Sequence, residues 1–216
     1  MWRPARRTTY AGVVALVLAT YAVSLAVEGA AGSAVAALLQ VLTVRLSLVH
    51  SGAGRRVLRF ADLVLVATGV LVVAVPTASA LGVGPSDVTL TVAYLLNAVL
   101  YAVAPVSILR DVTTRDRVDG STVLATVAAY LQIGIFFAFT FRVLASVTPA
   151  FPGPVDTADL MFFSFVTLTT TGYGNVVPTG WVAQTVAVIE VVVGQFFLVA
   201  AVGKIVAVWV PRRGPH

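Results

Sequence analysis

Residues 169–175 (TTTGYGN) bring together residue types that can coordinate a dehydrated cation. A cation that has lost its water shell needs oxygens in its place, and a row of backbone carbonyls aimed at one axis supplies them. Gly172 and Gly174 allow alternate residues to adopt backbone conformations closed to most side chains, so that successive carbonyls point the same way. The Thr170 hydroxyl can add an oxygen at one end, and Tyr173 can brace the loop by packing and hydrogen bonding.

The composition indicates that this loop belongs to a membrane protein. The 216 residues are 59% hydrophobic and only 11% charged, with a mean hydropathy of +0.98. A soluble domain of this size does not need so much apolar surface, so we expect the bilayer to be the solvent for most of the chain. The absence of cysteine excludes disulfides, thiolate metal sites and cysteine nucleophiles.

The apolar segments predict an all-α integral membrane protein. Crossing a bilayer takes roughly 20 residues, and six segments are long enough: 9–27, 31–49, 58–78, 88–109, 121–147 and 179–210. The third should stop or kink near Pro76. The amphipathic segment 157–169 is too short to span and leads directly into the glycine-containing loop. Non-helical backbone is tolerated at membrane depth only inside protein or along a watery cavity, so we expect a re-entrant helix and loop.

The charges of the short loops predict the orientation of the chain. Basic residues occupy alternate loops: Arg3, Arg6, Arg7, Arg55, Arg56, Arg59, Arg110, Arg115, Arg117, Arg212 and Arg213. The intervening loops carry Glu28, Asp87, Asp156 and Asp159 and no Lys or Arg. This alternation predicts a multi-pass protein of the cell membrane with both termini in the cytoplasm, and its scattered positive charge favours lipid contact over nucleic acid.

The N-terminal segment has two interpretations. Residues 1–27 have the basic start and apolar core of a signal peptide. The apolar run of about 19 residues is longer than the usual core, which favours an uncleaved first helix.

With these features the chain resembles the potassium channel superfamily, in particular small prokaryotic channels with six spans and one pore loop. The resemblance is specific over about 121–210 and only architectural over 1–120. In such channels four subunits surround a central pore and each contributes one loop, so a chain with one loop implies a homotetramer. The resemblance implies a peripheral four-helix domain over 1–120, sensor-like but poor in Arg, and a pore domain over 121–216.

Within the pore domain, the resemblance implies an outer helix at 121–147, a pore helix at 157–169, a filter at 170–174 and an inner helix at 179–210. The implied K⁺ ligands are Thr170, Thr171, Gly172 and Tyr173, and Gly174 completes the filter. The residues expected to support the filter are Phe162, Phe163, Thr167, Thr169, Asn175 and Glu190. Those expected at the cavity and gate are Gly194, Gln195, Leu198 and Val202. K⁺ is the permeant ion, and no cofactor is expected.

General physical principles agree with these assignments. They leave open the role of Gly194 and the role of the apolar residues beyond it. Asp156 or Thr157 can cap the pore helix, and Asp159 lies near its positive end. Its C-terminal end then directs a negative dipole toward the cavity. Gly194 is either a hinge or a site of close helix packing. Apolar residues farther along the inner helix either gate by dewetting or simply contact lipid and neighbouring helices.

The chain departs from the family pattern in three places. Asn175 occupies a position that is usually Asp, and Phe162 and Phe163 occupy the positions of a Trp pair whose indole helps to hold that Asp. Thr171 replaces the usual Val of the filter. The span 88–109 contains no basic residue, so steep voltage gating is not expected.

Ionisable residues at membrane depth are functional candidates because they are costly there. Glu190 either braces the filter by bonding Ser164 or Thr167, or acts as a proton-sensitive gate, since burial disfavours its charged form. Arg45 and Asp62 are expected to pair across helices. Arg142 either reaches the membrane interface or meets one of two acids. These acids are Asp156 and Asp159.

The sequence therefore predicts a potassium-selective channel that conducts K⁺ passively. The alternatives are a non-selective cation channel and, less favoured, a secondary transporter, which should show internal repeats and paired broken helices. An enzyme is not expected, because the two histidines lie far apart and no catalytic motif occurs.

Overall fold

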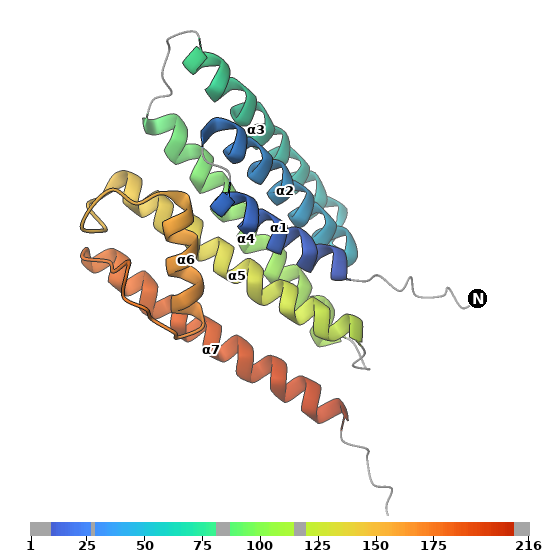
Figure 1. Ribbon diagram of the computed structural model, residues 1–216. Coiled ribbons are helices and arrows are strands. Elements are labelled where there is room, and N and C mark those ends of the chain that lie inside the picture. Colours follow the sequence, from blue (N-terminus) through green and yellow to red (C-terminus); the bar gives the residue numbers. More distant parts are fainter. Residues whose placement is uncertain (1–9, 27–28, 81–86, 115–119, 210–216) are drawn as a thin grey trace, which may run out of the picture.

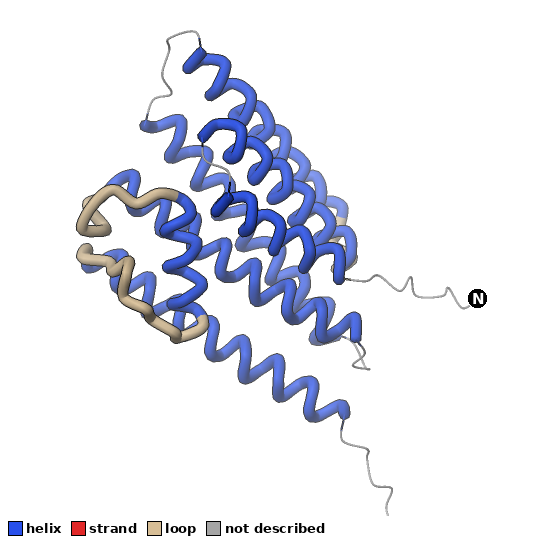
Figure 2. Tube along the Cα trace, viewed as in Figure 1, coloured by secondary structure: helices blue, strands red, loops and turns tan. Residues whose placement is uncertain are grey.

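The computed structural model describes residues 10–26, 29–80, 87–114 and 120–209, and within them the chain forms seven α-helices and no strand. The helices are α1 (Ala11–Ala26), α2 (Gly29–His50), α3 (Arg55–Ala80), α4 (Asp87–Thr114), α5 (Gly120–Val147), α6 (Thr157–Leu168) and α7 (Trp181–Trp209). Figure 1 shows the long helices running roughly along a common direction, with the short α6 between α5 and α7. Figure 2 shows the loop before α6 at one end of the helices, and the loop after α6 running back from the far end of α6 to the start of α7.

Helix α5 connects the two halves of the fold. It packs along α4 and also contacts α1 on one side, and it contacts α6 and α7 on the other (Figure 1). The most apolar stretch of α5 is 61% buried, whereas that of α7 is 17% buried. The chain therefore covers α5 with its own residues and leaves most of α7 uncovered.

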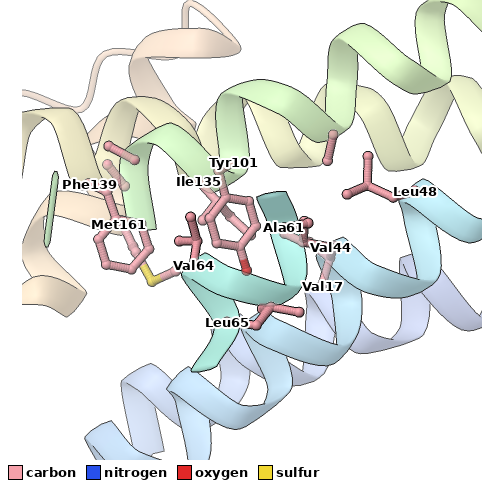
Figure 3. Close-up of a cluster of buried hydrophobic side chains, with 13 residues drawn as sticks. Val17, Val44, Leu48, Ala61, Val64, Leu65, Tyr101, Ile135, Phe139 and Met161 are labelled. Carbon is pink, nitrogen blue, oxygen red and sulfur yellow. The ribbon is translucent and has the colours of Figure 1, made fainter. Parts of the chain in front are cut away.

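An apolar cluster links the first four helices to the short helix α6 (Figure 3). Its members come from every helix from α1 to α6 and include Val17, Val44, Leu48, Val64, Tyr101, Ile135 and Met161. The ring of Tyr101 stacks on Phe139 of α5 at a centroid distance of 5.9 Å. Tyr21 of α1 makes an edge contact with Phe165 of α6 at 5.4 Å. Helices α1–α4 thus pack directly on the helices that position the loop.

The bounds of the helices differ from the sequence prediction at Pro76. Helix α3 continues beyond Pro76 to Ala80, so of the two outcomes predicted at this proline the stop is wrong, and the kink stays a prediction. Within the described residues, two helices are long and apolar enough to cross a bilayer, namely Gly120–Val147 and the Trp181–Lys204 part of α7. The other four spans stay predictions.

Candidate functional site

Helix α6 begins at a capping box. The Asp156 carboxylate accepts a hydrogen bond from the Asp159 N–H at 2.8 Å, and the Asp159 carboxylate accepts one from the Asp156 N–H at 3.1 Å. This reciprocal pair satisfies donors that a helix start leaves unpaired and places negative charge at the positive end of the dipole. The cap predicted at Asp156 is confirmed. The opposite, negative end of α6 faces the loop that follows it.

The loop that follows α6 alternates its backbone conformation from residue to residue. Thr170, Gly172 and Gly174 have positive φ angles of 58°, 57° and 78°, whereas Thr171 and Tyr173 do not. The need for glycine at two of these positions was predicted. The positive φ of Thr170 was not, and it costs about 1–2 kcal/mol for a side chain of this kind. Alternating φ signs turn successive peptide groups so that their carbonyls lie on one side.

Backbone donors of the loop turn back toward the end of α6. The Thr170 N–H donates to the Thr167 carbonyl at 2.9 Å, and the Thr171 and Gly172 N–H groups donate to the Val166 carbonyl at 2.8 and 3.1 Å. Among the residues that the structure describes, no donor reaches the carbonyls of 170–174. Residues 169–175 are all exposed. The loop therefore presents free carbonyl oxygens on its open side.

Threonine side chains stabilise the base of the loop. The Thr169 hydroxyl donates to the Phe165 carbonyl at 2.7 Å and lies 2.9 Å from the Thr171 hydroxyl. Thr167 is half-buried and contributes its carbonyl. Thr169 thus supports the loop through its side chain, and Thr167 supports it through its backbone.

The two phenylalanines of α6 face different surroundings. The Phe162 ring stacks on the Tyr173 ring at 5.9 Å, with an angle of 8° between their planes. Phe163 is buried and makes edge contacts with Phe141 and Phe151 at 4.9 and 5.6 Å. Phe162 therefore contacts the loop, whereas Phe163 anchors α6 in the core. Asn175, which follows the last glycine of the loop, is exposed.

Glu190 of α7 is fully buried behind the loop. Its Oε1 lies 2.5 Å from the Ser164 hydroxyl oxygen, and the same hydroxyl oxygen lies 2.7 Å from the Gly134 carbonyl of α5. Of the two partners predicted for Glu190, Ser164 is confirmed, and Thr167 has no such bond among the described residues. These contacts join α5, α6 and α7 at one point.

Gly194 marks the closest approach of α7 to the end of α6. A Cβ placed there would lie 2.6 Å from Leu168 Cδ1 and 3.1 Å from the Leu168 carbonyl oxygen. That carbonyl accepts a hydrogen bond from the Tyr130 hydroxyl at 3.1 Å. The geometry supports close packing at Gly194. The residues predicted for the cavity, Gln195, Leu198 and Val202, are exposed on the single chain.

The comparison with protein families coincides with this arrangement of helices. Residues 124–210, which cover most of α5, all of α6 and the loop, and α7, match a family model described as "Ion channel". The match indicates an ion channel. An ion channel domain points away from an enzyme, and together with the apolar helices it indicates a membrane protein. No curated protein and no solved structure matches the chain.

The structure shows the contacts of two basic side chains, Arg45 and Arg142. Arg45 Nε lies 3.1 Å from Asp62 Oδ1, which confirms the predicted pair, and both side chains are about half exposed. Of the two interpretations of Arg142, the contact with Asp156 or Asp159 is wrong, and its reach to the membrane interface stays a prediction. Its guanidinium donates to the Val155 carbonyl at 2.8 Å and lies over the Tyr94 ring, 4.9 Å from its centre.

Several predictions about the channel lie outside the described residues. They concern the basic residues of the termini and of one loop, one acid and the terminal histidine. These are Arg3, Arg6, Arg7, Glu28, Arg115, Arg117, Arg212, Arg213 and His216.

Proposed function

We propose that the chain is a potassium-selective channel in which residues 170–174 form the selectivity filter. The observation that carries this proposal is the loop backbone. Its φ angle changes sign at every residue from 170 to 174, the N–H groups of residues 170–172 donate to the end of α6, and its carbonyls have no donor among the described residues. Free, exposed carbonyls on one side of a loop are what a dehydrated cation needs.

In the proposed mechanism, K⁺ loses its water at the loop and moves between successive carbonyl sites. The backbone oxygens of Thr170, Thr171, Gly172 and Tyr173 coordinate the ion, and the Thr170 hydroxyl adds an oxygen at the inner end. Several sites in a row allow ions to bind and still leave, because neighbouring ions repel one another. The C-terminal end of α6 directs its negative dipole at the cavity, where it favours a partly hydrated cation.

We propose that four copies of the chain surround the pore. One loop offers carbonyls from one side only, so a closed coordination shell needs the loops of further subunits. The exposure of residues 169–175 supports this arrangement, as does the small buried share of α7, 17% in its most apolar stretch. Membrane lipids and neighbouring subunits are the partners that such an apolar surface requires.

We place the channel in the cell membrane with both termini in the cytoplasm. This orientation rests on the alternation of basic and acidic loops. Helices α1–α4 then form a peripheral domain without a charged sensor helix, since α4 contains no basic residue before Arg110.

A non-selective cation channel is the second candidate, and one contact favours it. Tyr173 is 71% exposed and is supported within the chain by a ring stack with Phe162, which supplies no hydrogen bond. Weaker support behind the loop would let it adapt to Na⁺. A secondary transporter is less favoured, because α6 and its loop are the sole broken segment among the described residues.

The reversal potential of the purified protein in planar bilayers tests the proposal. With K⁺ and Na⁺ present on both sides in opposed gradients, we expect reversal near the K⁺ equilibrium potential. Robust current that reverses near zero would favour the non-selective channel. The control is Gly174→Ala, which forces a side chain onto a φ of 78° and costs about 1–2 kcal/mol. Normal K⁺ current in that variant would contradict the filter assignment.

A further inference from the structure

The hydroxyl of Ser164 lies close to two oxygens that both need a proton from it. The Ser164 oxygen is 2.7 Å from the Gly134 carbonyl oxygen and 2.5 Å from Glu190 Oε1. A serine hydroxyl has one proton to donate and lone pairs that accept. A backbone carbonyl can only accept, and so can an ionised carboxylate. One proton cannot fill both contacts.

Both contacts of the Ser164 hydroxyl can be hydrogen bonds when Glu190 is a neutral acid. Ser164 then donates to the Gly134 carbonyl, and the carboxylic acid of Glu190 donates to the Ser164 oxygen. If Glu190 were ionised, one of the two contacts would bring lone pairs together at hydrogen-bond distance without a hydrogen between them. Unpaired oxygens at such a distance in a buried site repel each other.

The surroundings of Glu190 also favour the neutral form. Glu190 is fully buried, and its Oε2 has no hydrogen-bond partner among the described residues. A buried ionised carboxylate needs a cation or several donors. Helices α5 and α6 pack on α7, and Tyr130 of α5 is the titratable group facing Glu190. The Tyr130 hydroxyl donates its proton to the Leu168 carbonyl.

The charged groups of the neighbouring helices are engaged elsewhere. Arg142, the charged residue of α5, donates to the Val155 carbonyl. The acids at the start of α6, Asp156 and Asp159, accept from each other's backbone. On α7 itself, the other charged residue is Lys204, nearly four turns beyond Glu190. None of these groups neutralises a carboxylate at Glu190.

We infer that Glu190 is protonated in the folded channel and positions α6, the helix before the proposed filter, through two consecutive hydrogen bonds. One runs from Glu190 to Ser164 and the other from Ser164 to Gly134. These two hydrogen bonds run from α7 through α6 to α5 and fix α6 between its two neighbours. Their effect on the filter rests on the proposed function. The protonation state does not, because it follows from the contacts of Ser164.

Carboxyl-selective labelling tests the protonation state directly. The chain contains two glutamates, Glu28 and Glu190, so protein made with ¹³C-carboxyl glutamate carries two labels, and the Glu28→Gln variant carries one. We expect the solid-state NMR signal of Glu190 at neutral pH to be that of a carboxylic acid, and Ser164→Ala to shift it. A carboxylate signal in the membrane-embedded, folded protein would overturn the inference.

The positioning role is tested by a variant that imitates the neutral acid. Glutamine at position 190 can donate an N–H to Ser164, whereas alanine cannot. We expect Glu190→Gln to retain K⁺ flux, and Glu190→Ala and Ser164→Ala to lower it about tenfold, the effect of losing a buried hydrogen bond. Equal loss of flux in Glu190→Gln and Glu190→Ala would refute the positioning role. A neutral-acid signal combined with normal K⁺ current in Gly174→Ala would refute the proposed filter and leave the protonation state standing.

Discussion

Leu168, the last residue of α6, occupies the space that a side chain on Gly194 would need. The Leu168 side chain is fully buried, and its carbonyl accepts a hydrogen bond from the Tyr130 hydroxyl. The contact therefore joins the end of α6 to the middle of α7 and to α5. It gives Gly194 a role in packing that does not depend on bending of α7.

We predict that Gly194→Ala destabilises the channel. The added methyl group would meet the Leu168 carbonyl at 3.1 Å, and overpacking of this kind costs about 1–3 kcal/mol. The midpoint of thermal unfolding in detergent measures the effect. Gly203→Ala is the matched control, because a Cβ at Gly203 of the same helix meets nothing within 4 Å. A hinge role alone predicts equal stability for the two variants and altered opening in Gly194→Ala.

We predict that substitution of Phe162 weakens the support of Tyr173. Phe162→Leu removes the ring stack, which contributes about 0.5–1.5 kcal/mol, and we expect a lower K⁺ over Na⁺ permeability ratio. Phe162→Trp should retain the stack and leave that ratio unchanged. Phe163→Trp is the contrasting variant, because Phe163 is buried against Phe141 and Phe151. It should lower thermal stability, and a stable Phe163→Trp would contradict the assigned packing.

The helices around the loop were predictable from the sequence because their ends carry local signals. The apolar run from 121 to 147 and the acids at Asp156 and Asp159 mark boundaries that the structure reproduces within one residue. Glycine at positions 172 and 174 likewise predicted where φ is positive. These features depend on residues close to one another in the chain.

Features that depend on distant residues were missed. The positive φ of Thr170 follows from backbone bonds to Thr167 and from its neighbours' bonds to Val166, which no side-chain pattern reports. The partner of Arg142 was misjudged because Asp156 and Asp159 are used by the backbone of α6. The bond from the half-buried Tyr130 hydroxyl to the Leu168 carbonyl likewise joins residues far apart in the sequence, so no local pattern indicates it.

We predict that Arg45 does not act as a voltage sensor. It is paired with Asp62 at 3.1 Å, and such partly exposed pairs contribute only about 0–1 kcal/mol. The slope of the conductance–voltage curve should be shallow in the wild type and unchanged in Arg45→Gln. The double variant Arg45→Gln/Asp62→Asn controls for the acid left without a partner. A slope that becomes shallower on neutralising Arg45 would show that this residue carries gating charge.

A final prediction concerns the buried bond between α2 and α5. The Gln132 amide donates to the Ser47 hydroxyl oxygen at 2.5 Å, and both side chains are fully buried. Ser47→Ala leaves the amide without its acceptor, which costs about 1–3 kcal/mol. Gln132→Leu removes the amide and should cost less, so Ser47→Ala in the Gln132→Leu background should have little further effect on thermal unfolding.

Ser107→Ala is the control for this pair, because the one bond of the Ser107 hydroxyl among the described residues is to the Val103 carbonyl within its own helix. We expect it to be nearly neutral. Additive losses from Ser47→Ala and Gln132→Leu would mean that the two side chains do not interact. A coupling energy between them would instead show that this bond links α2 to α5, at a point one turn or less from Gly134, which accepts the hydrogen bond of Ser164.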